Sequence, residues 1–167
     1  MIGTAMEIIA WLSNQKDGLK FECDIHREKR SISANSLYWS CVTQIAKTEC
    51  KPAAYIHNEL LRQCGFLKDY DGEYIRVLLP DTDEIENKTM LDMDNHLMPV
   101  RGEKGEKVIG GKKYRWYMML KHSSDFDTKE MSILIDHTIE QMRIYGLTPP
   151  TERDIAGAIE RYERRRK

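Results

Sequence analysis

A cluster of cationic side chains lies early in the chain, a few residues before a tryptophan. Arg27, Lys29 and Arg30 precede a predicted helix, whose first backbone N–H groups point outward. Cationic side chains beside free N–H groups favour phosphate binding. On the same helix Trp39 shares a side with Asn35. Trp39 could stack on an unpaired base, or it could pack internally with its indole N–H bonded to a carbonyl.

A second group of aromatic and basic residues occupies positions 112–117. Alternation along a strand divides it into two faces, with Lys112, Tyr114 and Trp116 on one and Lys113, Arg115 and Tyr117 on the other. A sheet face that mixes aromatics and cations is typical of proteins that bind single strands. The alternative is a hairpin that buries its aromatic face. The three cations are candidate DNA-binding residues, and the terminal Arg-Arg-Arg-Lys could add phosphate contacts or remain a solvated end.

Side chains suited to catalysis are sparse. The densest set of histidines and carboxylates is His122, Asp125, Asp127, Glu130, Asp136, His137 and Glu140. Two of these are expected to cap a helix, and most of the others fall on its solvated face, which makes a metal site weak. His57-Asn58 resembles a His-Asn nuclease pair but lies inside a plain helix. The sequence has no nucleotide-binding glycine motif and no nucleophile elbow, so we predict no catalytic residue, metal site or cofactor.

Composition limits the classes of protein that fit. The chain has 167 residues, 32% of them charged, and a net charge of only −1. Nucleic-acid binding through bulk positive charge is therefore excluded, and any such binding must use a local patch. The four cysteines form no C-x-x-C pair and are expected to be reduced thiols. Since we find no signal peptide and no run near the ~20 apolar residues that span a bilayer, we expect a cytoplasmic protein without membrane contact.

Hydrophobic periodicity and turn signals predict an α+β fold. Expected helices lie at about 5–15, from Ser31 or Ser33 to about 48, 52–64, 127–146 and 152–167, and expected strands at 19–26, 66–70, 73–79, 96–101 and 112–121. Asp71-Gly72 marks a hairpin, and a Gly-containing loop joins the last two strands. We expect a small mixed fold with a short antiparallel sheet, about five helices and a C-terminal helix. The predicted domain covers 1–147, followed by a connector and basic helix at 148–167.

One segment resembles a known family. Arg30, Ser31, Asn35, Trp39 and Cys41 match, at the same spacing, the R-S-[LI]-x-x-N-x-x-x-W-x-C stretch of the phage NinB recombination proteins, the lambda Orf family. A second stretch, Ser123-Ser124 followed by Asp127-Thr128-Lys129-Glu130-Met131, is similar to a run in NinB-like proteins of Gram-positive prophages. The first match covers about a dozen residues.

The resemblance implies a non-catalytic recombination accessory protein with an α+β fold. Such a protein would form a homodimer, bind single-stranded DNA and help exchange between single-strand-binding protein and recombinase in the bacterial host cell. Arg30, Asn35 and Trp39 carry over as motif positions. Some Gram-positive relatives carry an HNH-type nuclease label, so a metal-dependent DNA nuclease is one alternative. A non-enzymatic interaction module is the other, because nine carboxylates between residues 69 and 94 could dock a basic partner or mimic the charge of DNA.

Overall fold

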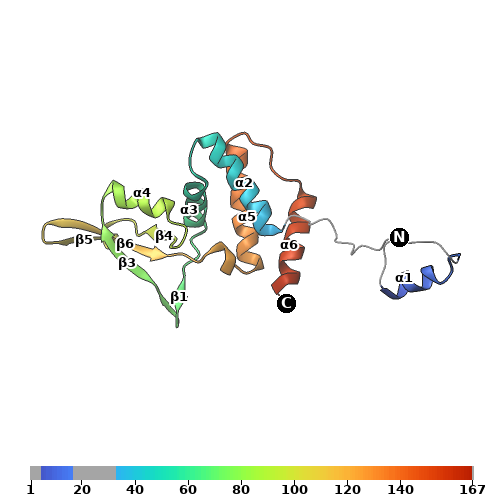
Figure 1. The fold of residues 1–167 in the computed structure, drawn as a ribbon. Coiled ribbons are helices and arrows are strands. Elements are labelled where there is room, and N and C mark those ends of the chain that lie inside the picture. Colours follow the sequence, from blue (N-terminus) through green and yellow to red (C-terminus); the bar gives the residue numbers. More distant parts are fainter. Residues whose placement is uncertain (1–4, 17–32, 167) are drawn as a thin grey trace. The chain divides into compact units, whose positions relative to one another are not determined.

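The computed structural model describes residues 5–16 and 33–166 (Figure 1). By internal contacts the chain separates into two units, 1–31 and 32–167. In the first unit helix α1 (Ala5–Leu12) occupies the place of the first predicted helix. The predicted strand at 19–26 lies outside the described residues, as do Arg27, Lys29 and Arg30.

The second unit mixes helices with antiparallel strands, which confirms the predicted α+β class. Its helices are α2 (Ala34–Glu49), α3 (Ala53–Cys64), α4 (Asp83–Leu91), α5 (Thr128–Ile144) and α6 (Glu152–Arg166), with 3-10 turns η1 (Glu103–Gly105) and η2 (Ser123–Asp125). Its strands are β1 (Asp69–Tyr70), β2 (Glu73–Tyr74), β3 (Arg76–Pro80), β4 (Leu97–Pro99), β5 (Glu106–Ile109) and β6 (Lys112–Met119).

The ends of the two longest helices follow directly from local sequence. Ser33 caps α2, and its Oγ accepts the Ser36 N–H at 3.2 Å. At α5 the predicted capping box is present: Asp127 accepts the Glu130 N–H at 2.8 Å, while Glu130 accepts the Asp127 N–H at 3.0 Å. Since the first N–H groups of a helix have no partner within it, such caps define where it begins.

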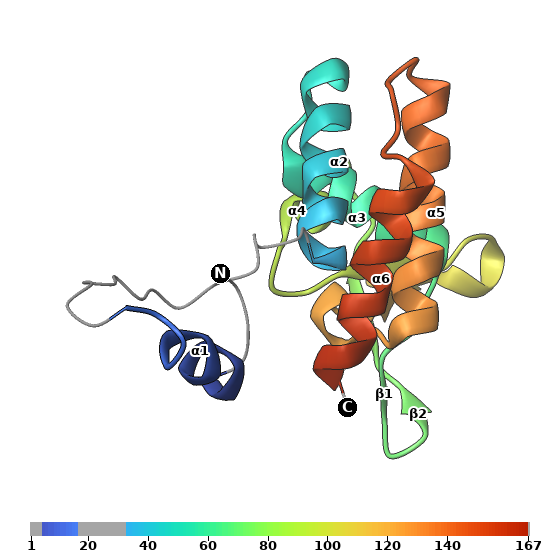
Figure 2. The ribbon, with the colours of Figure 1, turned by 90° about the vertical axis from the view of Figure 1, so that its right-hand side faces the viewer.

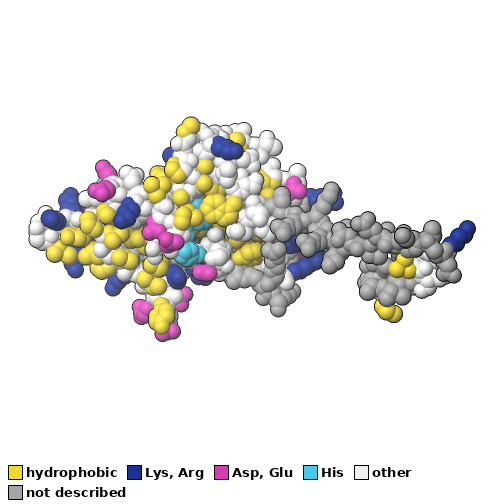
Figure 3. Space-filling view, in the orientation of Figure 1, with side chains coloured by type: hydrophobic (Ala, Val, Ile, Leu, Met, Phe, Trp, Pro, Cys, Tyr) yellow, Lys and Arg dark blue, Asp and Glu magenta, His cyan; other side chains and the backbone are white. Residues whose placement is uncertain are grey.

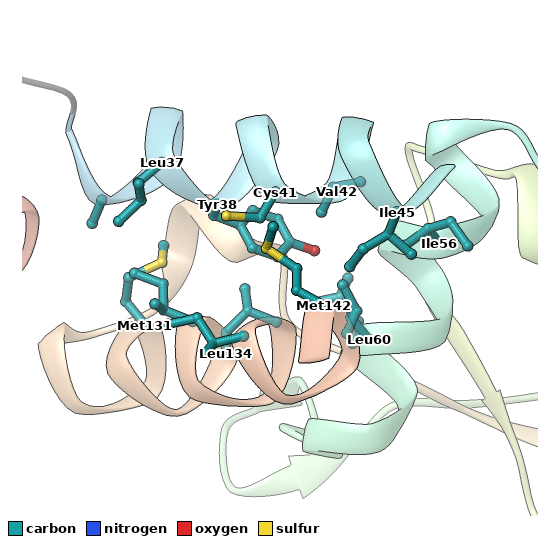
Figure 4. Packing of buried hydrophobic residues seen from close by; sticks show 14 of the residues in the cluster. Leu37, Tyr38, Cys41, Val42, Ile45, Ile56, Leu60, Met131, Leu134 and Met142 are labelled. Carbon is teal, nitrogen blue, oxygen red and sulfur yellow. The ribbon is translucent and has the colours of Figure 1, made fainter. Parts of the chain in front are cut away.

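The hydrophobic core lies among α2, α3, α5 and α6, which stand side by side in Figure 2. The predicted stripe of α2 is buried and faces α5 and α3 (Figure 4): Leu37, Tyr38, Cys41, Val42 and Ile45. Burial of each Leu, Val or Ile side chain contributes roughly 1.5–3 kcal/mol relative to an exposed one. From α6, Ala158 is fully buried in the same core, and the Tyr162 hydroxyl donates to the Phe126 carbonyl. The C-terminal helix is therefore packed as a core element.

The main sheet holds β3, β6 and β4 in that order, and β5 also pairs with β6. The predicted Asp71-Gly72 hairpin is present as β1–β2. The prediction of a Gly-containing loop between 101 and 112 was wrong, because η1 and β5 occupy most of this stretch. Gly110 and Gly111, both with positive φ, form a tight turn between β5 and β6. Helix α4 was also not predicted. Thr82 caps its N-terminus, and the Thr82 hydroxyl accepts the Ile85 N–H.

Polar side chains connect α3 to α4 and to the sheet. Arg62 of α3 donates to the Leu97 carbonyl at 2.7 Å, to Thr89 Oγ1 at 2.9 Å and to the Glu86 carboxylate. The hydroxyl of Tyr117, on β6, donates to the other oxygen of Glu86 at 2.8 Å. One face of the sheet is thereby held against α4. Among the described residues, no helix has both the length and the apolar character to cross a bilayer.

Candidate nucleic-acid interface

The motif helix α2 places its two candidate side chains differently. Asn35 is exposed in the first turn. Trp39 is half-buried and its indole lies 4.6 Å from the His57 ring at an interplanar angle of 31°, with Tyr38 at its edge. Because one face of the indole is covered by an imidazole, Trp39 has a packing role, and at most one of its faces is open to a base.

Beyond Trp39, three histidines from distant parts of the chain form a row. The ring centroids of His57 and His96 are 4.9 Å apart, and those of His96 and His122 are 4.6 Å apart. Nδ1 of His57 lies 2.6 Å from the Tyr38 hydroxyl, and Nδ1 of His96 lies 2.7 Å from Oδ1 of Asn58. The Asn58 amide nitrogen donates to backbone carbonyls, so its oxygen must accept and His96 must carry its proton on Nδ1.

The two buried histidines of this row, His57 and His96, are neutral at neutral pH. Burial lowers the pKa of His57 to about 3, and the charges of His96 and His122 act in the same direction. Burial also lowers the pKa of His96 to about 4, with His122 acting in the same direction while Asp92 and Asp94 oppose it. His57 and His96 therefore supply no positive charge to a phosphate at neutral pH.

The histidines and carboxylates of 122–140 are dispersed. Asp127 and Glu130 cap α5, and Glu130 also accepts from Lys121 Nζ at 2.7 Å. Asp136 and His137 are exposed on α5. Within residues 5–16 and 33–166, no group of three or more His, Cys, Asp or Glu side chains is arranged to hold a metal ion.

Residues 112–117 of strand β6 alternate between the two sides of the sheet, as predicted. Tyr117 is buried toward α4. On the same side, Arg115 donates to both oxygens of Asp81, at 2.8 and 3.0 Å, and to the Val100 carbonyl. The hydrogen bonds and charge of Arg115 hold the pKa of Asp81 below its usual value. Because of these contacts, the guanidinium of Arg115 has a structural role. Lys113, which lies on the same side of β6, is exposed.

The other side of the sheet carries apolar, aromatic and basic side chains, and it is open except at Met98, which packs against the helical core. From the strand register, the residues sharing this side are Arg76, Leu78, Pro80, Met98, Lys107, Ile109, Lys112, Tyr114, Trp116 and Met118. We call this set the aromatic–basic face. Every member is exposed or half-buried, and none is acidic. The Arg76 guanidinium lies 5.2 Å from the Trp116 ring centroid, a cation–π contact.

Figure 3 shows hydrophobic side chains at the surface over these strands, with Lys and Arg around them. Histidine side chains reach the same surface where the strands meet the helices (Figure 3). Of the predicted residues, Lys112 belongs to the aromatic–basic face, whereas Lys113 and Arg115 lie on the α4 side. All three are candidate DNA-binding residues from the sequence, but only Lys112 shares the open side with Tyr114 and Trp116, in keeping with the alternation.

Two cations of the aromatic–basic face, Arg76 and Lys107, were not identified from the sequence as site residues, and neither was the apolar Ile109. Lys107 and Ile109 come from β5, a strand whose sequence predicted a loop. The Gly110-Gly111 pair between two β-rich runs was the available signal, because a two-residue turn with positive φ at both positions joins hairpin strands.

Comparison of the chain with protein-family models, with curated proteins and with solved structures finds no match.

Proposed function

We propose that this protein binds single-stranded DNA, without sequence preference, through the aromatic–basic face of its sheet. The observation that carries the proposal is the combination of Tyr114 and Trp116 with Arg76, Lys107 and Lys112 on one acid-free face. Aromatic rings stack on any base, and cations beside them neutralise phosphates, so the face suits a flexible single strand. It suits a duplex less well, because paired bases are not available for stacking.

We further propose that it acts as a phage recombination accessory protein in the cytoplasm of the bacterial host, as a homodimer that assists exchange between single-strand-binding protein and recombinase. The resemblance of Arg30, Asn35 and Trp39 to the NinB motif supports this role. On this proposal Trp39 chiefly organises the histidine row, since His57 covers one of its faces.

The direct test is titration of a fluorescent thymidine oligonucleotide by anisotropy at several salt concentrations, with the matched duplex beside it. Tyr114→Ala should weaken binding by about 1–3 kcal/mol, which is roughly 5- to 150-fold, because it removes one stacking platform. Lys107→Ala with Lys112→Ala should reduce the slope of log affinity against log salt by about 0.7 for each phosphate that the two lysines neutralise.

Lys113→Ala is the matched control, because Lys113 adjoins Lys112 and Tyr114 in sequence but belongs to the other side of β6. It should leave affinity and salt slope nearly unchanged. If Lys113→Ala weakens binding as much as Lys112→Ala, or if Tyr114→Ala has no effect in a folded protein, the aromatic–basic face is not the binding surface.

The accessory role needs its own assay. Strand exchange by a bacterial recombinase on DNA coated with single-strand-binding protein should be accelerated by the wild-type protein and not by the Tyr114→Ala variant. The same DNA incubated with the protein and Mg²⁺ or Mn²⁺ should remain intact. Cleavage that follows the protein through purification and disappears in His122→Ala would favour the nuclease alternative.

A further inference from the structure

The side of the sheet that faces α4 contains a half-open pocket of about 320 Å³. Its walls come from β3, α4, the turn after it, β4 and β6. The lining is mainly apolar, from Val77, Leu79, Ile85, Leu97 and Met119, and also includes the polar residues Lys88, Thr89, Asp92 and Asn95. We call this the α4 pocket. Its volume is sufficient for one or two bulky apolar side chains.

The segments that wall the α4 pocket also carry exposed apolar and acidic side chains. Leu91 and Met93, which flank Asp92 in sequence, are 48% and 40% exposed. Asp83, Glu84 and Asp94 are exposed carboxylates on α4 and on the turn that follows it. These carboxylates outnumber Lys88, the cation of the pocket lining. The electrostatic potential around the pocket therefore favours a positively charged ligand and repels phosphate.

Hydrogen bonds hold the walls of the pocket in place in the absence of a ligand. Arg62 and Tyr117 both bind the Glu86 carboxylate of α4. Asn58 donates to the Met90 and Asp92 carbonyls at 3.0 and 2.8 Å, which anchors the end of α4. The Asp92 carboxylate accepts the N–H groups of Asp94 and Asn95. A preformed pocket costs a ligand little ordering entropy on the protein side.

We propose that the α4 pocket docks a basic segment of a partner protein, in which one or two bulky apolar side chains enter the pocket and flanking Lys or Arg side chains meet Asp83, Glu84 and Asp94. An apolar anchor in a central pocket with charged groups at the rim is the usual anatomy of a protein–protein contact. An acidic partner or a nucleic acid would face the same carboxylates unfavourably. The surface lies on the opposite side of β6 from the aromatic–basic face, and it does not depend on DNA binding.

Methyl-detected NMR with a synthetic octapeptide of sequence Lys-Lys-Arg-Leu-Phe-Arg-Lys-Lys tests this proposal. Saturable shifts should be centred on the methyl groups of Val77, Leu79, Ile85, Leu97 and Met119. A peptide with Ala-Ala in place of Leu-Phe tests the anchor, and one with Glu in place of every Lys and Arg tests the charge. Both should bind at least about threefold more weakly than the parent peptide.

Two protein variants separate the pocket from its rim. Leu79→Phe should fill the pocket and weaken peptide binding about tenfold or more, with the melting temperature checking that the protein folds. The triple variant Asp83→Asn, Glu84→Gln, Asp94→Asn changes only exposed side chains, so it should fold and bind about threefold or more weakly. Oligonucleotide affinity should not fall in either variant.

Several results would overturn the proposal. Equal binding of the Ala-Ala peptide would show bulk charge attraction, and equal binding of the Glu peptide would remove the charge argument. Peptide-induced shifts centred on the methyl groups of Leu78, Met98 and Met118 would place the contact on the aromatic–basic face. Chemical-shift changes at the pocket methyl groups that grow with protein concentration in the absence of peptide would identify a second copy of this chain as the occupant.

Discussion

The two sides of the β3–β6–β4 sheet carry opposite chemistry although they are built from the same strands. On one side Tyr114 and Trp116 lie half-exposed among cations. On the other, Tyr117 is buried under α4 and Arg115 is bound to Asp81. Neighbouring residues of β6 therefore differ in role because strand side chains alternate. The residue type alone, Tyr or Arg, does not tell which role each one has.

The comparison also shows how charge is sorted in a chain with almost no net charge. Arg76, Lys107 and Lys112 share the open side. On the other side, the segments that wall the pocket, α4 and the turn that follows it, carry the exposed carboxylates. A net charge of −1 thus conceals two local fields of opposite sign.

The largest difference between the two sides should appear when equivalent tyrosines are truncated. Tyr117→Ala should lower the free energy of unfolding by about 3–5 kcal/mol, because it empties a buried site and leaves Glu86 without one hydrogen-bond donor. Tyr114→Ala, three residues earlier, should cost about 1 kcal/mol or less. Urea denaturation of both variants measures the contrast, and similar losses would mean that the open side is buried in solution.

Acid should destabilise the packing of α4, because Asn58 joins the end of α4 to His96. The folded pKa values of His57 and His96 lie below the usual value near 6.5, so the unfolded chain takes up protons first. Stability should be complete above about pH 6.5 and fall as the pH decreases toward 4 and 3. The slope should be about 1.4 kcal/mol per pH unit for each histidine that titrates.

Urea denaturation at a series of pH values checks this expectation. His96→Gln keeps a donor for Asn58 but cannot take up a proton, so its stability should change less between pH 6.5 and pH 4 than that of the wild-type protein. An unchanged pH profile in this variant would mean that His96 does not contribute to the acid sensitivity.

Most helices could be predicted because their signals are local. The Ser33 cap, the Asp127–Glu130 box and the apolar stripe of α2 each lie within a few residues and agree with one another. The alternation that divides β6 is equally local. Helix α4 was hidden because its segment is an acidic stretch with a weak apolar pattern, and packing of Thr89 and Met90 against α3 stabilises it instead.

The candidate site was harder to predict because it depends on distant residues. His57, His96 and His122 lie far apart in sequence, and only folding brings their rings together. The bond of Arg115 to Asp81 likewise spans 34 residues, so the sequence, which placed Arg115 and Lys112 on opposite faces of the strand, could not tell which of the two faces is open. Which cations share a face depended on the register of β5, and the sequence of that strand predicted a loop.

A smaller contrast separates the cations of β6. Arg115→Gln should lower stability by about 1 kcal/mol, since it removes a two-point ion pair that is about one-quarter exposed, and it should leave oligonucleotide affinity unchanged. Lys112→Gln should do the reverse, with unchanged melting and weaker, less salt-dependent binding. Calorimetry and anisotropy on the same samples measure both properties. A loss of DNA affinity in a stable Arg115→Gln variant would extend the binding surface around the edge of the sheet.

The smallest expected effect tests where the aromatic–basic face ends. Gly111 has φ +76° and a Cβ there would meet no atom within 4 Å, so Gly111→Ala introduces backbone strain alone, of about 1–2 kcal/mol. The strain should fray β5, seen as faster hydrogen exchange at Val108 and Ile109, with little change in global unfolding. Gly110→Asn, which tolerates positive φ better, is the control. Because β5 supplies Lys107 and Ile109, fraying should weaken oligonucleotide binding by no more than Lys107→Ala does. Unchanged affinity despite a frayed β5 would place the DNA on β3 and β6 alone.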